Sequence, residues 1–267
     1  MKTVKFLFLA LAALACGCLL FESCNKTSNS GAGHLQVLLT DGPAPYDAVY
    51  IDVQKVEVNV SSDSGTSSGW QTVGILRPGV YDLLKFSNGI DTLLAAADLP
   101  AGTLSQMRLV LGSNNSVVIG GQSFPLTTPS AQQSGLKFNI HSTLTAGIVY
   151  RLWIDFDANR SIVSAGNSGK YLLKPVIRTY TAAIGGSIKG YVLPSAAKSQ
   201  VWAAMGTDTL MALADTATGY YFFGGVNAGS WNLSFHPRDS TYRDTAFAVS
   251  VSTGVVTNAG TVTLNKK

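Results

Sequence analysis

The sequence predicts an all-β protein with two sandwich-like domains that follow an N-terminal lipoprotein signal. Short β-branched segments alternate with turn-forming residues, and the 267 residues include 27 glycines. No stretch has the 3.6-residue periodicity of an amphipathic helix of ordinary length. Charged residues make up only 13% of the chain, the formal net charge is +4, and there is no basic cluster. This composition excludes the electrostatic footprint of a nucleic-acid-binding protein.

The first 23 residues have the layout of a secretory signal peptide. Lys2 and Lys5 precede an apolar run over residues 6–21. The run is shorter than the roughly 18 to 20 apolar residues that span a bilayer as a helix. The pattern therefore predicts a removable signal over residues 1–23 rather than a permanent membrane span.

The cysteines indicate which kind of signal this is. All three of them, Cys16, Cys18 and Cys24, lie within the first 24 residues, so the folded remainder has no thiol for an internal disulfide or a metal site. A thiol that follows an apolar run and precedes a polar stretch suits lipid attachment, and more than one acyl chain makes the anchorage stable. We expect Cys24 to be lipidated, residues 24–33 to be a tether, and the membrane to be a partner. Lipidation of Cys18, or an ordinary cleaved signal, is the alternative.

Residues 20–24, Leu-Phe-Glu-Ser-Cys, resemble the relaxed lipobox of some Gram-negative lipoproteins. A strict lipobox has Leu three residues before the cysteine and a small residue two before it, whereas this chain has Phe21 and Glu22 there. Because of this departure, Cys18 remains the alternative lipidation site to Cys24. The resemblance implies a lipid-anchored protein of the bacterial cell envelope, expected at the outer membrane, with the periplasmic or surface face left open.

The first β domain is expected over residues 34–181. Its clearest strand covers residues 49–60, where the alternation of apolar side chains slips near Gln54 and Lys55. A one-residue slip would turn every later apolar side chain outward, so a β-bulge is expected at that point. Pro175 predicts an edge position or a bulge in the last strand, and residues 92–97 are expected as a short helix. The other expected strands are 70–75, 106–111, 117–119 and 122–124 around a Gly-Gly turn, 136–141, 149–156 and 172–180.

A second domain is expected over residues 185–267, after a short linker. Seven short apolar runs separated by turns fit a small β-sandwich. The runs are residues 187–193, 200–205, 209–214, 220–226, 230–235, 245–251 and 257–264.

Two family resemblances agree with this division. Residues 39–49, 155–163 and 169–177 resemble family 4382 of domains of unknown function, which occurs in bacterial lipoproteins. Residues 186–192 and 218–231 are similar to the carboxypeptidase regulatory-like, transthyretin-type sandwich, which is grouped with carbohydrate-binding-like folds. The resemblances imply a fold and an adhesive or spacer role rather than a reaction.

The sequence does not present an enzyme motif in the context that its chemistry needs. It has no His-Glu-x-x-His pair and no phosphate-binding loop, and its three histidines are His34, His141 and His236. No Gly-x-Ser-x-Gly elbow presents a nucleophilic serine, because residues 65–69, which have this pattern, lie in a Ser- and Gly-rich turn. A carboxylate pair of the kind used in glycoside hydrolysis could come together from distant strands. The candidates are Asp41, Asp47, Asp82, Asp155 and Asp157, although an Asp near a turn usually accepts local backbone N–H groups. We expect neither an enzyme nor a cofactor.

Asp155, Asp157 and Asn159 place oxygen ligands at alternate positions, as in the first half of a calcium loop. The helical calcium loop fails later, because Arg160 stands where Gly is required and Gly166 where the bidentate Glu belongs. These residues are the weak metal candidates. The simpler interpretation is that they end one strand and cap the next turn.

Residues 220–223, Tyr-Tyr-Phe-Phe, are the most informative local feature. In a strand Tyr220 and Phe222 face one side, and Tyr221 and Phe223 face the other. A sandwich has one core side per sheet, so a neighbouring domain, a partner or a ligand must cover the outward pair. Aromatic rings flanked by hydroxyl and amide groups also suit sugar stacking, and packing in the core or between domains is the alternative. The candidate ligand-binding residues are Trp202, Tyr221, Phe223, Trp231 and Tyr242.

The sequence therefore predicts a non-enzymatic envelope lipoprotein with a binding role, for a glycan or an envelope protein. The alternative is a structural spacer or adhesin-type subunit. The third hypothesis is a carboxylate-dependent hydrolase.

Overall fold

The computed structural model describes residues 31–60, 69–128, 135–166, 168–182 and 185–267. The fold is all-β, as predicted, and the helical segments of these residues are η2 (Leu83–Phe86), α3 (Ala158–Ser161) and η3 (Ser195–Ala197). Across these ranges no helix has the length and apolar character needed to cross a bilayer. The predicted signal peptide and the three cysteines lie outside the described residues.

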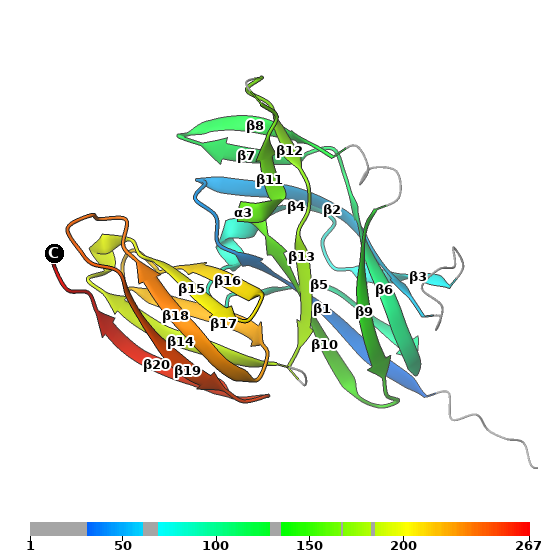
Figure 1. Ribbon diagram of the computed structural model, residues 1–267. Coiled ribbons are helices and arrows are strands. Elements are labelled where there is room, and N and C mark those ends of the chain that lie inside the picture. The colour runs from blue at the N-terminus through cyan, green and yellow to red at the C-terminus, as the bar shows by residue number, and fades with distance from the viewer. Residues whose placement is uncertain (1–30, 61–68, 129–134, 167, 183–184) are drawn as a thin grey trace, which may run out of the picture.

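The strands gather into two bodies (Figure 1). The first body contains β1 (Ala32–Gly42), β2 (Ala48–Asn59), β3 (Trp70–Ile75), β4 (Gly79–Asp82), β5 (Thr92–Pro100), β6 (Gly102–Leu111), β7 (Ser116–Ile119), β8 (Gln122–Thr127), β9 (Leu136–Leu144), β10 (Val149–Asp157), β11 (Ile162–Ser164), β12 (Tyr171–Leu173) and β13 (Ile177–Thr181). β1 begins at Ala32, so the last residues of the predicted tether belong to the sheet.

Two curved layers of the first body enclose one apolar core. β1 pairs with β5 and, in parallel, with β10, while β2 pairs with β6, and β6 pairs with β9. Val37, Val58 and Ile154 come from the two layers, and all three are fully buried in the same cluster. β13 lies beyond β10 at the end of the order β3-β5-β1-β10-β13.

The predicted β-bulge in β2 is confirmed. The register between β2 and β6 shifts between Val53 and Lys55. Val53 and Val56 are buried on either side of it, whereas Gln54 and Lys55 are exposed. The extra residue therefore keeps the valines of both halves of the strand in the core.

The predicted Gly-Gly hairpin is also confirmed. β7 and β8 pair antiparallel, and the turn between them has Gly120 at φ 58° and Gly121 at φ 77°. A two-residue turn with two positive φ values matches the twist of the flanking strands, and glycine adopts it without steric cost.

Some sequence predictions for the first body are wrong. Residues 92–97 form part of β5 rather than a helix, because pairing with β1 and β3 overrides their local propensity. The single strand expected over residues 172–180 is two strands, β12 and β13, with Pro175 in the gap between them. β1, β4 and β11 were not predicted as strands.

The second body is a seven-stranded sandwich, as predicted. Its strands are β14 (Gly186–Leu193), β15 (Gln200–Met205), β16 (Asp208–Leu213), β17 (Tyr220–Val226), β18 (Gly229–His236), β19 (Thr245–Val251) and β20 (Val256–Thr263). The order β17-β14-β20 forms one sheet and the order β16-β15-β18-β19 forms the other. Ile188, Tyr221, Trp231 and Phe235 belong to a separate core between the two sheets.

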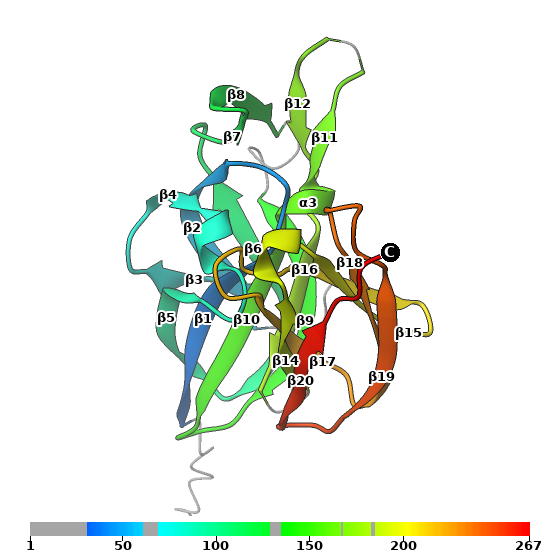
Figure 2. The same cartoon turned by 90° about the vertical axis from the view of Figure 1, so that its left-hand side faces the viewer.

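The two bodies lie side by side in Figure 1, and in Figure 2 the second body stands in front of part of the first. β17 contacts β13, and β16 contacts β1. We call this contact region the junction.

Candidate functional site

The outer face of β10 carries polar and aromatic side chains toward the junction. Leu152, Ile154 and Phe156 of this strand are buried in the first core. The period of two places Trp153 and Asp155, between them, on the opposite face. β10 pairs with β13 so that Asp155 is opposite Arg178.

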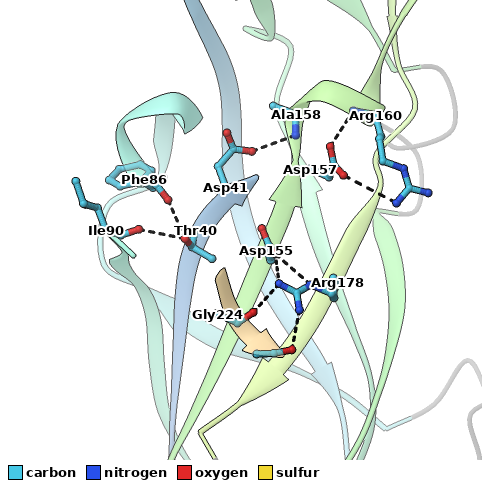
Figure 3. Close-up of polar contacts among 11 residues, drawn as sticks. Thr40, Asp41, Phe86, Ile90, Asp155, Asp157, Ala158, Arg160, Arg178 and Gly224 are labelled. Atoms are coloured by element: carbon cyan, nitrogen blue, oxygen red, sulfur yellow. Dashed lines mark hydrogen bonds and ion pairs between the residues drawn. The ribbon is translucent and has the colours of Figure 1, made fainter. Parts of the chain in front are cut away.

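Arg178 links the two bodies through all three of its guanidinium nitrogens. Its Nη2 and Nε donate to Oδ2 of Asp155 at 2.6 and 3.2 Å. Its Nη1 donates to the carbonyl of Gly225 and its Nη2 to the carbonyl of Gly224, both at 2.8 Å. Figure 3 shows the side chain extending from β13 toward Asp155 and toward the backbone at Gly224. A single side chain thus satisfies a carboxylate of one body and two carbonyls of the other.

An aromatic stack lies beside this bridge. The rings of Trp153 and Tyr180 are parallel within 2°, with centroids 5.5 Å apart, and the guanidinium of Arg178 lies 5.0 Å from the Tyr180 ring. Trp153 Nε1 donates to Asp91 Oδ2 at 2.7 Å. Burial and, to a smaller extent, the nearby Asp155 carboxylate raise the pKa of Tyr180.

The loop after η2 makes a second link across the junction. Asn88 Nδ2 donates to the carbonyl of Leu213 at 3.0 Å. Gly89 lies against Phe222, since a Cβ at this glycine would come within 3.1 Å of the ring. The neighbouring body therefore covers outward-facing Phe222. Tyr220, the other outward ring, contacts Tyr191 with centroids 5.4 Å apart.

The candidate carboxylates near the junction have local hydrogen-bonding roles. Asp155 is bound by Arg178. Asp157 is the N-cap of α3 and accepts from the backbone N–H of Arg160 at 2.9 Å, as the capping interpretation expected. Burial raises the pKa of Asp157. Among the residues that the structure describes, no group of three or more His, Cys, Asp or Glu side chains could hold a metal ion. This finding does not include asparagine, so a metal at Asp155, Asp157 and Asn159 stays a prediction.

The other three candidate carboxylates are also engaged. Asp41 is buried, and its Oδ1 accepts from the backbone N–H of Ala158 at 3.1 Å. Asp82 Oδ2 lies 3.8 Å from Lys85 Nζ, and Asp47 Oδ2 accepts from the backbone N–H of Gly121 at 2.8 Å.

Two histidines pair with exposed carboxylates. Nδ1 of His34 lies 2.7 Å from Asp98, and Nδ1 of His236 lies 2.7 Å from Asp244. The side chain of His141 lies outside the described residues.

Three of the five predicted ligand-binding aromatics are buried in the second core. Tyr221, Phe223 and Trp231 are 0%, 4% and 2% exposed. The alternation in residues 220–223 is as predicted, but Tyr221 and Phe223 occupy the inward face. The prediction that these three side chains form an open stacking surface is therefore wrong. Tyr242 and Trp202 remain half-buried.

Trp202 lines a groove beside the junction, with a volume of about 580 Å³. Arg160, Thr179 and Tyr180 come from the first body, and Trp202, residues 207–210 and Asn227 come from the second. We call this space the junction groove. Apart from Trp202 and Trp231, sequence reasoning did not connect these residues with a binding site, because no local motif relates side chains that come from α3, β13 and the turn before β16.

A search of curated proteins gave no match. Among solved structures, the Bacillus anthracis TIE protein is 11% identical at a TM-score of 0.24, and the alignment covers 88% of this chain and 34% of that protein. This chain therefore spans about a third of that structure. The shaft pilin SpaA from Lactobacillus rhamnosus GG (E269A mutant) is 8% identical at a TM-score of 0.24, over 89% of this chain and 98% of the pilin. GBS52, a minor pilin of Streptococcus agalactiae, is 11% identical at a TM-score of 0.24, and the alignment covers 87% of this chain and 96% of the pilin.

These likenesses are too distant to support a functional argument. The sequence is more informative, because the family described as "Domain of unknown function (DUF4382)" matches residues 32–175. This match includes β1 and β10, whose ends form one side of the junction, and ends before Arg178. It covers more than half of the chain, and the chain therefore belongs to the DUF4382 family.

Proposed function

We propose that this chain is a non-enzymatic structural lipoprotein of the bacterial cell envelope, in which the junction holds two β bodies as one rigid spacer. The observation that carries the proposal is the bridge from Arg178 to Asp155 and to the carbonyls of Gly224 and Gly225. A binding module on a flexible linker would not need such a bridge.

The chemistry of the bridge favours a fixed geometry. Hydrogen bonds in which a charged guanidinium donates are shorter and stronger than neutral ones. The Arg178 and Asp155 side chains are 33% and 16% exposed, so water competes only partly for their donors and acceptors. Of the bonds in the bridge, only those to Gly224 and Gly225 cross the junction, and a hydrogen bond to a charged group contributes about 1.5 to 3 kcal/mol net, which opposes separation of the bodies.

The envelope location is supported by the sequence of the first 24 residues. The charged start, the apolar run and Cys24 fit export and lipid attachment. The hydrolase hypothesis has little support from the site, because each of the five candidate carboxylates is engaged in a hydrogen bond or ion pair.

The rigidity can be tested with spin labels at Thr103 on β6 and Thr261 on β20, two exposed strand positions in different bodies. Replacing the three native cysteines by serine leaves only the introduced label sites. Pulsed electron spin resonance should give one narrow distance distribution for the parent chain. Arg178→Met should broaden it, because Asp155 and two carbonyls lose their donor.

Arg151→Met is the matched control. Arg151 lies on the face of β10 that also carries Trp153 and Asp155. It is exposed, and its Nε donates to Gln36 within the first body. This variant should keep the narrow distribution. A broad distribution in the parent chain, or equal widths for the Arg178 and Arg151 variants, would contradict the rigid spacer.

A further inference from the structure

The junction groove has the size and position of a ligand site. Its volume of about 580 Å³ falls within the range of about 300 to 1,000 Å³ that is typical of small-molecule pockets. It lies between two bodies, where such sites often occur.

Trp202 forms an aromatic wall of the groove. It stands on β15 between Val201 and Ala203, which are fully buried, so its indole projects from the opposite face of the sheet. Its cross-strand neighbours are Met211 and Ser234. Within the described part of the chain, the indole N–H has no hydrogen-bond partner and the ring has no aromatic partner.

Polar groups whose hydrogen bonds are few or long lie along the same groove. The hydroxyls of Thr207 and Thr209 have no hydrogen-bond partner among the described residues. The amide of Asn227 lies 3.5 Å from Asp208. The Arg160 side chain is 65% exposed, and its guanidinium lies 3.9 Å from the Asp157 carboxylate.

The charges of the groove favour a neutral ligand. Arg160 supplies one positive charge and Asp208 one negative charge, while the charge of Arg178 is balanced by its ion pair with Asp155. The balance disfavours a strongly charged ligand. A wall with both donors and acceptors around an indole matches a molecule that presents many hydroxyls and an apolar ring face.

We propose that the junction groove binds a neutral oligosaccharide, with Trp202 stacking against a sugar ring and Arg160, Asp208 and Asn227 bonding to its hydroxyls. Of the three aromatic residues buried in the second core, Trp231 borders this groove, whereas Tyr221 and Phe223 do not line it. The proposed binding goes beyond the spacer role, because a rigid junction requires no ligand.

The test is calorimetric titration of the full chain with maltohexaose, cellohexaose, xylohexaose, mannohexaose and chitohexaose, and with hexagalacturonate as the acidic probe. At least one neutral hexasaccharide should bind, and more tightly than hexagalacturonate. Trp202→Ala should weaken that binding about tenfold, because it removes the stacking surface. Arg160→Met should weaken it severalfold while leaving Trp202 in place.

Tyr191→Ala is the control for non-specific stacking. Tyr191 is 44% exposed and lies on the other sheet, outside the groove, so its removal should leave binding unchanged. The proposal is overturned if no neutral probe binds at about 10 mM, if hexagalacturonate binds best, or if Trp202→Ala and Tyr191→Ala bind equally well.

The two proposals fail separately. A narrow spin-label distribution in the Trp202→Ala chain would show that lost binding does not come from a loosened junction. A broad distribution together with intact sugar binding would overturn the spacer alone.

Discussion

Asp41 is an acidic side chain in an apolar setting. It continues the inward face of β1 after Val37 and Leu39, and it is 4% exposed. Its Oδ1 accepts from Ala158 N–H, whereas its Oδ2 is buried with no partner in the described part of the chain. Burial, more than any nearby charge, raises its pKa well above the ordinary value of 3.8. The folded protein therefore holds this proton more tightly than the unfolded chain does.

Asp41→Asn should therefore be stabilising at higher pH. The wild-type protein loses stability as pH rises from the unfolded-state pKa through the raised folded-state pKa, because the ionised carboxylate is poorly solvated when folded. Asparagine keeps the acceptor for Ala158 without the charge. The difference in free energy of unfolding between variant and wild type should grow over that range, as measured by urea titration at a series of pH values.

Asp41→Ala is the matched control, because it removes the acceptor as well as the charge. It should lower the stability of the protein at acidic pH, where the wild-type carboxyl is neutral, by about 1 to 3 kcal/mol. A difference between Asp41→Asn and wild type that does not change with pH would show that the carboxyl is not the titrating group.

At the level of elements, β17 and β13 approach each other closely because Gly224 and Gly225 both lie against Tyr180. Gly225 has φ 60°, and a Cβ at this position would lie 2.1 Å from Cγ of Tyr180. Gly120, in the β7–β8 turn, has nearly the same φ of 58°, with nothing within 4 Å of a Cβ. The two glycines therefore share the backbone requirement and differ only in the space around them.

Gly225→Ala should destabilise the protein more than Gly120→Ala. Each variant carries the cost of a left-handed alanine, about 1 to 2 kcal/mol. Only Gly225→Ala must also displace the Tyr180 ring, which is stacked on Trp153. Thermal unfolding of both variants would measure the difference, and spin labels at Thr103 and Thr261 would show whether the junction opens. Equal stability losses would mean that β17 and β13 can separate at little cost.

At the level of the whole molecule, the proposed tether and the rigid junction have complementary roles. A lipidated Cys24 would hold the chain at a membrane, and β1 begins at Ala32, a few residues later. The first body would then lie close to the membrane surface, and the junction would set the direction of the second body relative to the first.

The anchor can be tested by metabolic labelling with a palmitate analogue in a lipoprotein-processing bacterium. Wild-type protein and Cys18→Ser should be labelled, whereas Cys24→Ser should not, because it removes the acyl acceptor. Label that survives Cys24→Ser and disappears with Cys18→Ser would move the anchor to Cys18. An unlabelled wild-type protein would contradict lipid attachment altogether.

Features that depend on local physics could be predicted from the sequence. The bulge in β2 follows from a slip in the alternation of valines, and the Gly120-Gly121 turn follows from the freedom of glycine to take positive φ. The bounds of β17 and the alternation of its four aromatic residues were correct for the same reason, since the pleat of a strand alone determines them.

Where the local pattern allows two conformations or two orientations, only the tertiary structure decided which one forms. The pleat does not say whether Tyr221 or Phe222 faces the core; packing against Phe235 on the opposite sheet decides that. Residues 92–97 became a strand because β1 supplied hydrogen-bond partners. Arg178 meets Gly224 46 residues away in the chain. The all-β class is thus a property of the sequence, whereas the junction and its groove come from long-range packing, because they join side chains that no local pattern relates.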